Sequence, residues 1–303
     1  MSHVSNGESS SEAGDRERRL AEWLQERGTV LVGFSGGVDS AYLACVAVDV
    51  LGAENVLAVI GTSASYPEAQ WSTARAVARE FGVPVLEVAT TELSDPRYAA
   101  NPTNRCYFCK SELWSRLAPL AAERGLACII DGTNADDLGD YRPGAQAARE
   151  WGVRSPLAEL GFSKAEIRAL SRSRGLPTWR QPSAPCLSSR IPYGTSVTPE
   201  RLRRIERAEA ALRSLGIAGD LRVRFHGNLG RVELSPGELS AWLAPVAASR
   251  VRAAVLAAGF ERVAIDLRGF RSGSLNVLGG VVAEAPTGQP NDDVPSNHQV
   301  TAA

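Results

Sequence analysis

The stretch Ser35-Gly36-Gly37-Val38-Asp39-Ser40 decides the fold. It follows the apolar, β-branched run V-L-V-G-F at 30–34 and precedes A-Y-L-A-C-V-A-V at 41–48. This order predicts a strand, a tight glycine-rich turn and a helix. Backbone N–H groups of such a turn point to one spot at the positive end of the helix. The turn is therefore predicted to bind an anion, with the Ser35 and Ser40 hydroxyls as further donors.

The turn lacks the lysine of a G-x-x-x-x-G-K-[ST] phosphate loop, so it is a different phosphate-binding device. The pattern S-G-G-x-D-S resembles the pyrophosphate loop of the N-type ATP pyrophosphatases, which split ATP into adenylate and pyrophosphate. The resemblance implies an adenine nucleotide alpha hydrolase-like fold. It also implies that ATP is bound by Ser35, Gly36, Gly37, Asp39 and Ser40. The alternative is an ordinary Ser/Gly turn.

Strand and helix patterns alternate along the first half of the chain. Strands are predicted at 55–60, 85–88 and 126–130, and helices at 15–27, 68–81, 111–124 and 163–174. Such alternation predicts an α/β fold with a doubly wound parallel sheet, which binds ligands at the carboxyl ends of its strands. The polar loops 35–40, 62–65 and 132–137 should therefore surround one crevice. They add these candidate ATP-binding residues: Thr62, Ser63, Gly132, Thr133 and Asn134.

Two aspartates, Asp136 and Asp137, follow the fourth predicted strand. Pyrophosphate release needs Mg²⁺, which takes carboxylate and phosphate oxygens. Asp39, Asp136 and Asp137 are therefore the predicted Mg²⁺ or phosphate partners. The alternative is a cluster that caps a helix N-terminus, and both readings can hold together.

A proline-rich link at 177–199 separates this region from a second, smaller α+β domain. That domain has predicted helices at 199–215 and 239–258, a hairpin at 221–225 and 231–234, and a strand at 263–267. The predicted organisation is a disordered tail at 1–14, an ATP pyrophosphatase domain at 15–185, a smaller α+β domain at 186–278 and a disordered tail at 279–303.

Composition narrows the class of protein. The 303 residues are 44% hydrophobic and 22% charged, which is typical of globular proteins. We expect no membrane association, because no apolar run approaches the ~18 residues that a span requires. The polar start is no signal peptide, and five cysteines, an odd number, favour a reducing cytoplasm. His226 is the one histidine inside the predicted folded region, which argues against a Ser-His-Asp triad or a His-rich metal site.

Basic residues concentrate in the second domain. The stretch 186–278 holds 14 Arg and 8 acidic residues, which indicates an anionic ligand. Arg222 and Arg224 alternate along a predicted strand and are suited to hold a substrate phosphate. The chain as a whole has few lysines and no long basic stripe interleaved with aromatics, so a nucleic-acid partner is not expected.

The cysteines form two sets. Cys45 and Cys128 lie among apolar residues and are interpreted as packing groups. Cys106 and Cys109 form a C-x-x-C, and Cys186 stands in the link near Arg190, a setting that can lower a thiol pKa. Three interpretations are open. Cys106 and Cys109 can form a redox pair in which Cys186 takes no part, or Cys186 alone can be a sulfur-donating thiol. All three can also be ligands of a [4Fe–4S] cluster with one iron open to an extra sulfide. A structural zinc is weakly supported, because it needs a fourth ligand.

Four segments together resemble the LarE family of ATP-dependent sulfur transferases: S-G-G-V-D-S, N-R-C-Y-F-C-K, G-T-N-A-D-D and P-C-L-S-S-R-I-P-Y-G-T. The resemblance spans about residues 20–274. It implies that ATP adenylates a carboxylate of pyridinium-3,5-biscarboxylic acid mononucleotide and that sulfur then replaces the adenylate. The product leads to the nickel-pincer nucleotide of lactate racemase and related enzymes.

The resemblance also assigns residues. It implies that Cys186 is catalytic, either as a sacrificial sulfur donor or, in a three-cysteine branch, as a ligand of a sulfide-carrying [4Fe–4S] cluster with Cys106 and Cys109. The three cysteines here favour the second branch. Arg222 and Arg224, together with Arg190 beside the catalytic cysteine, are the predicted substrate-binding residues. A homo-oligomer is implied too. The alternatives are a tRNA-thiolating enzyme, an amide synthetase and a non-catalytic adenine-nucleotide-binding module.

Overall fold

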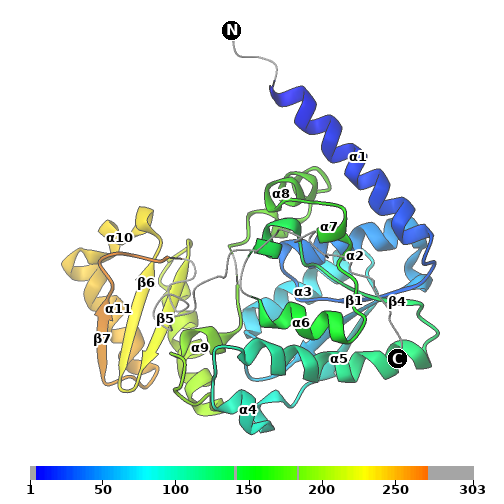
Figure 1. The fold of residues 1–303 in the computed structure, drawn as a ribbon. Coiled ribbons are helices and arrows are strands. Elements are labelled where there is room, and N and C mark those ends of the chain that lie inside the picture. Colours follow the sequence, from blue (N-terminus) through cyan, green and yellow to red (C-terminus); the bar gives the residue numbers. More distant parts are fainter. Residues whose placement is uncertain (1–4, 140–141, 183, 272–303) are drawn as a thin grey trace, which may run out of the picture.

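Four short apolar strands form a parallel sheet in the first half of the chain (Figure 1). They are β1 (Val30–Gly33), β2 (Val56–Thr62), β3 (Val85–Ala89) and β4 (Cys128–Asp131), in the order β3-β2-β1-β4. The computed structural model describes residues 5–139, 142–182 and 184–271. The helices of this half are α1 (Ser5–Gln25), α2 (Val38–Leu51), α3 (Glu68–Glu80), α4 (Pro96–Ala99), α5 (Arg105–Glu123), α6 (Pro143–Glu150), α7 (Pro156–Glu159) and α8 (Lys164–Ser173), with short 3₁₀ turns η1 (Ala53–Asn55), η2 (Glu92–Ser94), η3 (Ala135–Gly139) and η4 (Pro177–Arg180).

Both faces of the sheet are covered by helices because alternate strand residues point to opposite sides. Val30 and Val32 pack in a core with α1, α2, α3 and α8, whereas Leu31 packs in a second core with α5 and α6. The strands therefore read as continuous apolar runs, as expected for a sheet buried on both faces. The predicted doubly wound α/β sheet is confirmed.

The second half contains a smaller mixed sheet. Its elements are η5 (Leu187–Arg190), α9 (Pro199–Ser214), β5 (Leu221–His226), β6 (Leu229–Leu234), α10 (Pro236–Leu243), α11 (Pro245–Ala257) and β7 (Arg262–Ile265). β5 and β6 form the predicted hairpin, and β7 adds parallel to β6. Their core also takes up Tyr98 of α4 and Phe108 of α5, so the first half contributes directly to the packing of the second.

Three elements differ from the sequence-based expectation. Helix α1 starts at Ser5, within the stretch predicted to be disordered, whereas the predicted tail 279–303 lies outside the described residues. The helix predicted at 111–124 starts at Arg105, so the C-x-x-C lies on its first turns. The helix predicted at 239–258 is two helices, because Pro245 has no N–H to continue α10 and disfavours helical backbone at Ala244.

Among the described residues, no single helix has the length and apolar character needed to cross a membrane. α10 and α11 meet that test only when taken together, across a bend of 100°.

Candidate active site

The loop 35–40 joins the end of β1 to the start of α2 and is held closed by its own serines. Ser40 Oγ accepts a hydrogen bond from the Ser35 N–H at 3.2 Å and donates one to the Gly37 carbonyl at 3.2 Å. Gly36 has φ +65°, and a Cβ there would lie 2.5 Å from the Cβ of Ala74 on α3. Only glycine therefore fits at this point of the turn.

The loop after β4 lies directly against this turn. A Cβ on Gly132 would lie 2.8 Å from the Ser40 nitrogen, so the two backbones touch. β1 has β2 on one side and β4 on the other, which makes the β1–β4 edge the switch point where doubly wound sheets bind ligands. The structure thus brings Thr133 and Asn134, predicted from sequence, next to the turn.

The segment after β2 reaches the same turn from the other side. Tyr66 Oη and Gln70 Nε2 both donate to the Ser35 carbonyl, at 2.9 and 2.8 Å. Thr62 is the last residue of β2, and Ser63 follows it with its hydroxyl 2.9 Å from that of Ser65. All three predicted loops therefore meet at one end of the sheet.

Two of the three predicted aspartates, Asp39 and Asp136, contact a lysine that the sequence analysis did not single out. Lys164, the first residue of α8, forms an ion pair with Asp39 through Nζ and donates its backbone N–H to Asp136 at 2.8 Å. Asp137 accepts from the Asn134 N–H at 3.2 Å. Asp136 and Asp137 thus bind backbone N–H groups, as the capping alternative requires. The scarcity of lysine in the chain was the one available signal for Lys164.

The buried position of Asp39 affects its carboxylate. Burial raises its pKa above the ordinary value, although the Lys164 ammonium opposes this. Its Oδ1 atom is buried and has no hydrogen-bond partner. In the described part of the chain, no group of three His, Cys, Asp or Glu side chains is arranged to hold a metal ion. Phosphate oxygens of a bound nucleotide are suited to complete the ligand shell of a cation at Asp39.

The three candidate sulfur residues come together from two distant segments. The Cys106 residue reaches the surface, but protein groups surround its thiol closely; Cys109 and Cys186 are partly exposed. Burial among protein groups and the proximity of Cys186 raise the pKa of the Cys106 thiol. The pKa of the Cys109 thiol is raised by burial, by Glu92 and by Cys186. The hydrogen bond from Arg105 to the Ser188 carbonyl, at 3.2 Å, joins the two cysteine-bearing segments, so the fold brings the three cysteines into one region.

Two charged residues beside these thiols were missed by sequence reasoning. Glu92 is 2% exposed and accepts from the Ser65 hydroxyl at 2.9 Å and the Thr90 hydroxyl at 2.8 Å. Arg105 is also buried; burial lowers its pKa, but the nearby Cys186 and Cys106 thiols outweigh this and leave the pKa raised. A charged residue next to a C-x-x-C was the only signal for Arg105.

The Cys186 segment is hydrogen-bonded to the end of the sheet where the loops 35–40, 62–65 and 132–137 meet, which we call the nucleotide end of the sheet. The Leu187 N–H donates to the Ser65 carbonyl at 2.8 Å. Earlier in the link, Gln181 Nε2 donates to Gln70 Oε1 at 2.8 Å, and Gln70 in turn binds the Ser35 carbonyl. The link therefore lies against the loops that follow β1 and β2.

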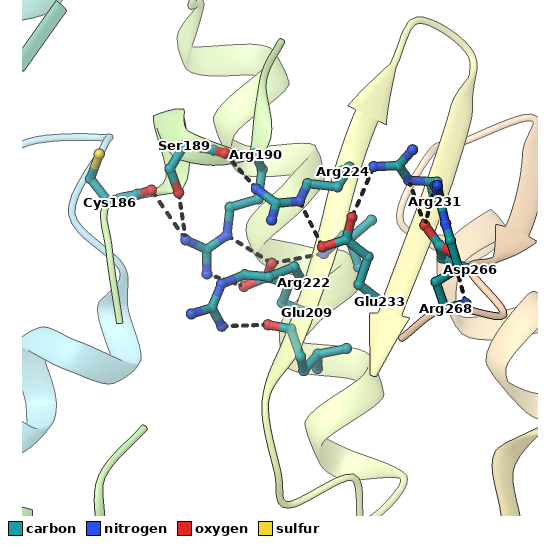
Figure 2. A network of polar contacts seen from close by, with 12 residues as sticks. Cys186, Ser189, Arg190, Glu209, Arg222, Arg224, Arg231, Glu233, Asp266 and Arg268 are labelled. Atoms are coloured by element: carbon teal, nitrogen blue, oxygen red, sulfur yellow. Dashed lines mark hydrogen bonds and ion pairs between the residues drawn. The ribbon is translucent and has the colours of Figure 1, made fainter. Parts of the chain in front are cut away.

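Arg190 lies beside Cys186, but it holds the backbone of that residue (Figure 2). Its guanidinium donates to the carbonyls of Pro185 at 2.7 Å and Cys186 at 3.2 Å and pairs with both oxygens of Glu209 at 2.9 Å. The Cys186 sulfur points away from this pair in Figure 2. Arg190 therefore contacts the backbone of Cys186 and not its thiol, whose pKa the sequence analysis expected it to lower.

Arg222 and Arg224 point to the same region from β5 and are almost fully buried. Arg224 donates to Glu233 at 2.9 Å and to the Ser189 carbonyl at 2.8 Å, which joins β5 to the Cys186 segment. Arg222 lies over the Phe270 ring at 4.9 Å, and burial and the nearby Arg190 lower its pKa to about 10. The structure therefore brings Arg190, Arg222 and Arg224 together.

Comparisons with known proteins cover both halves of the chain. The NAD synthase family profile matches residues 15–107. An uncharacterized protein of Synechocystis is 47% identical over 257 residues, which is 85% of this chain and 95% of that protein. The pyridinium-3,5-bisthiocarboxylic acid mononucleotide synthase of Lactiplantibacillus plantarum is 38% identical over 261 residues, 86% of this chain and 94% of the synthase. The glutamine-dependent NAD(+) synthetase of Aquifex aeolicus is 38% identical over 66 residues, 21% of this chain and 12% of that synthetase.

Proposed function

The chain belongs to the LarE family, and from this premise we propose that it is an ATP-dependent sulfur transferase acting on pyridinium-3,5-biscarboxylic acid mononucleotide. A substrate carboxylate attacks ATP, which releases pyrophosphate and leaves an acyl adenylate. Sulfide sulfur then attacks the acyl carbon, and AMP leaves as the thiocarboxylate forms. The observation that supports this most is the hydrogen bond from Leu187 to Ser65, because it ties the sulfur-bearing segment to the nucleotide end of the sheet.

The loop 35–40 is suited to the first half-reaction. Its backbone N–H groups lie at the N-terminus of α2, where a leaving pyrophosphate is stabilised without a cationic side chain in the loop. Asp39, with its unpartnered Oδ1, fits one protein ligand of a Mg²⁺ that phosphate oxygens complete. Asp136 and Asp137 are the other candidate ligands. The ion would neutralise phosphate charge.

The sulfur is proposed to come from the region of the three cysteines, which would hold an iron–sulfur cluster. Thiolates are the usual ligands of iron–sulfur clusters, and Cys106, Cys109 and Cys186 lie in one region. The three thiols are not arranged to bind one metal ion together. This does not argue against a [4Fe–4S] cluster, because the cluster holds its cysteine ligands further apart than a single ion does. Such a cluster would supply an exchangeable sulfide. The alternative is that Cys186 gives up its own sulfur.

Intact mass of the chain after one anaerobic turnover separates the two sources. An unchanged polypeptide supports the cluster, whereas loss of the elements of H₂S at Cys186 establishes sacrifice. Under the cluster proposal, Cys106→Ser and Cys109→Ser abolish iron binding and thiocarboxylate formation. Full single-turnover activity in both variants would exclude the cluster.

Arg222 and Arg224 are proposed to hold the substrate phosphate. They are buried beside the Cys186 segment, and guanidinium groups bind phosphate oxygens in pairs. Arg190 holds the Cys186 backbone through two carbonyls, so we propose that it contributes mainly through its charge.

The decisive assay combines purified protein, ATP, Mg²⁺ and the pyridinium dicarboxylate mononucleotide. We expect AMP, pyrophosphate and thiocarboxylate in wild type. The matched variant Cys186→Ala should still release pyrophosphate but form no thiocarboxylate. Pyrophosphate release that responds to tRNA and not to the nucleotide would establish the RNA-thiolating alternative instead. Light scattering of the same sample measures the oligomeric state, for which a homo-oligomer is proposed.

A further inference from the structure

Tyr98, Asn101 and Arg105 bind a segment of the link far away in sequence. Asn101 is fully buried and, among the described residues, is the only non-glycine with a positive φ, 58°. Asparagine adopts this conformation more readily than other non-glycine residues, and it is common just after the end of a helix, where Asn101 follows α4. What sets Asn101 apart is therefore the set of hydrogen bonds that its buried side chain makes.

The side-chain amide group of Asn101 donates its hydrogen bonds to carbonyls of the link. Nδ2 donates to the carbonyls of Pro192 at 2.8 Å, Thr195 at 2.9 Å and Ile191 at 3.3 Å. The Asn101 carbonyl accepts from the Gly194 N–H at 2.9 Å. One side chain and its backbone thus fix the course of residues 191–195.

Arg105 completes the connection toward the cysteines. Its Nη1 donates to the side-chain oxygen of Asn101 and to the Ser188 carbonyl at 3.2 Å. Tyr98 adds a contact of 2.7 Å between its hydroxyl and that of Ser188. Ser188 lies two residues after Cys186, and Cys106 follows Arg105 directly. The bonds therefore join the two cysteine-bearing segments where the thiols lie.

We propose that Asn101 and Arg105 are positioning residues that hold the link against the start of α5, so that Cys186 stays beside Cys106 and Cys109. This inference rests on the proposed function in assigning a purpose to the three thiols. The arrangement itself is a property of the protein without metal or substrate. We define these two residues and Tyr98 as the clamp.

The test is thiol cross-linking of the metal-free full chain with dibromobimane, which becomes fluorescent only when it joins two nearby thiols. In the Cys106→Ser background, the rate of forming the Cys109–Cys186 link is mapped by peptide mass. Asn101→Gly removes the side chain while keeping a residue suited to φ +58°, and Arg105→Met keeps length without donors. Each should slow this link at least tenfold.

Three controls isolate positioning from general loosening. The Cys106–Cys109 link, measured with Cys186→Ala, lies within α5 and should not change in Asn101→Gly. In Arg105→Met its change measures the effect of the lost charge on thiol reactivity, for which the Cys109–Cys186 rate is corrected. Val251→Ala, in the core of the second domain, should lower stability without slowing the Cys109–Cys186 link. Pyrophosphate release should stay within twofold in both clamp variants.

An unchanged Cys109–Cys186 rate in Asn101→Gly and Arg105→Met would overturn the proposal. Where either variant does not fold, Tyr98→Phe, which removes one hydroxyl, provides the same comparison with a smaller expected decrease of about threefold. Failure of the sulfur-transferase proposal would instead appear as absent pyrophosphate release in wild type, which leaves the cross-linking result unaffected.

Discussion

The loop 35–40 and the arginines of β5 are both suited to phosphate, but they are built in opposite ways. The loop uses backbone N–H groups at a helix N-terminus, fixed by a glycine that packs on Ala74. The arginine region, formed by Arg190, Arg222 and Arg224, uses guanidinium groups buried against carboxylates that come from α9 and β6. The loop should therefore be sensitive to added atoms, and the arginine region to lost charges.

The largest expected effect on stability comes from removing a carboxylate of the arginine region. Glu209→Ala leaves Arg190, whose side chain is 4% exposed, without its bidentate partner and also frees the Val223 N–H. Breaking such a buried pair costs about 3–5 kcal/mol of unfolding free energy, measured by urea denaturation. Glu200→Ala, on the same helix but 74% exposed, should cost at most about 1 kcal/mol. Equal losses would contradict the comparison.

The loop should respond to a single methyl group. Gly36→Ala places a Cβ 2.5 Å from Ala74 at a positive φ, and we expect a loss of about 1–3 kcal/mol together with at least tenfold slower pyrophosphate release. The neighbouring Gly37→Ala meets its closest atom, Ser35 Oγ, at 3.5 Å and should be near wild type in stability. If the two alanines behave alike in both assays, the loop does not depend on the Gly36 geometry.

Arg222→Lys tests whether the arginine region needs a guanidinium. Burial lowers the pKa of Arg222 to about 10, so the wild-type side chain stays charged at pH 7–9. A lysine starts from a lower pKa of about 10.4, so the same burial makes it lose charge as pH rises through that range. We expect the KM for the nucleotide to rise about tenfold at pH 7, about 1.4 kcal/mol, and further by pH 9, with the KM for ATP unchanged. A pH-independent KM in the variant would show that the charge is not used.

The smallest effect should come from neutralising Asp39. Since burial raises its pKa in the folded protein, the charged carboxylate opposes folding above the ordinary value of 3.8. Asp39→Asn should therefore stabilise the protein by up to about 1 kcal/mol at pH 7 while slowing pyrophosphate release. The gain should vanish as pH falls below 3.8, where the wild-type carboxyl is protonated in both states. Denaturation at pH 7 and at pH 3.5 measures it, and a gain that is equal at both would refute the assignment to this carboxyl.

The contrast between the loop 35–40 and the arginine region also explains which features could be predicted from the sequence. The strands, their parallel direction and the meeting of loops 35–40 and 132–137 depend on local periodicity and on six consecutive residues, so they were predicted correctly; the order of the strands in the sheet was not predicted. The early start of α5 at Arg105 was missed although Asn104, which precedes it, is a residue type favoured at the N-cap; in the structure its side chain makes no capping hydrogen bond. The break before Pro245 was a local signal that was overlooked.

Residues that act through tertiary contacts left little trace in the sequence. Lys164 reaches Asp39 across 125 residues of chain, and Glu92 meets Ser65 across 27. Neither separation follows from a helix or strand period. The partner of Arg190 comes from α9, whose packing against the link no pattern specifies. Glu233, the partner of Arg224, lies on the other strand of the predicted hairpin, but the sequence analysis did not single it out. Residue type alone predicted that these arginines would handle charge, whereas the carboxylates that hold them emerged only from the fold.

The clamp also constrains the order in which the protein is made. Asn101 binds carbonyls 90 to 94 positions further along the chain, so these bonds cannot form until the ribosome has released the residues up to 195. Until then, Cys106 and Cys109 lie on a nascent helix without their third thiol. Contacts of such long sequence separation form late in folding, because closing a large loop is entropically costly. The three-thiol arrangement therefore forms only after the link has emerged and packed against α5, and anything that requires all three thiols can engage the chain only from that point on.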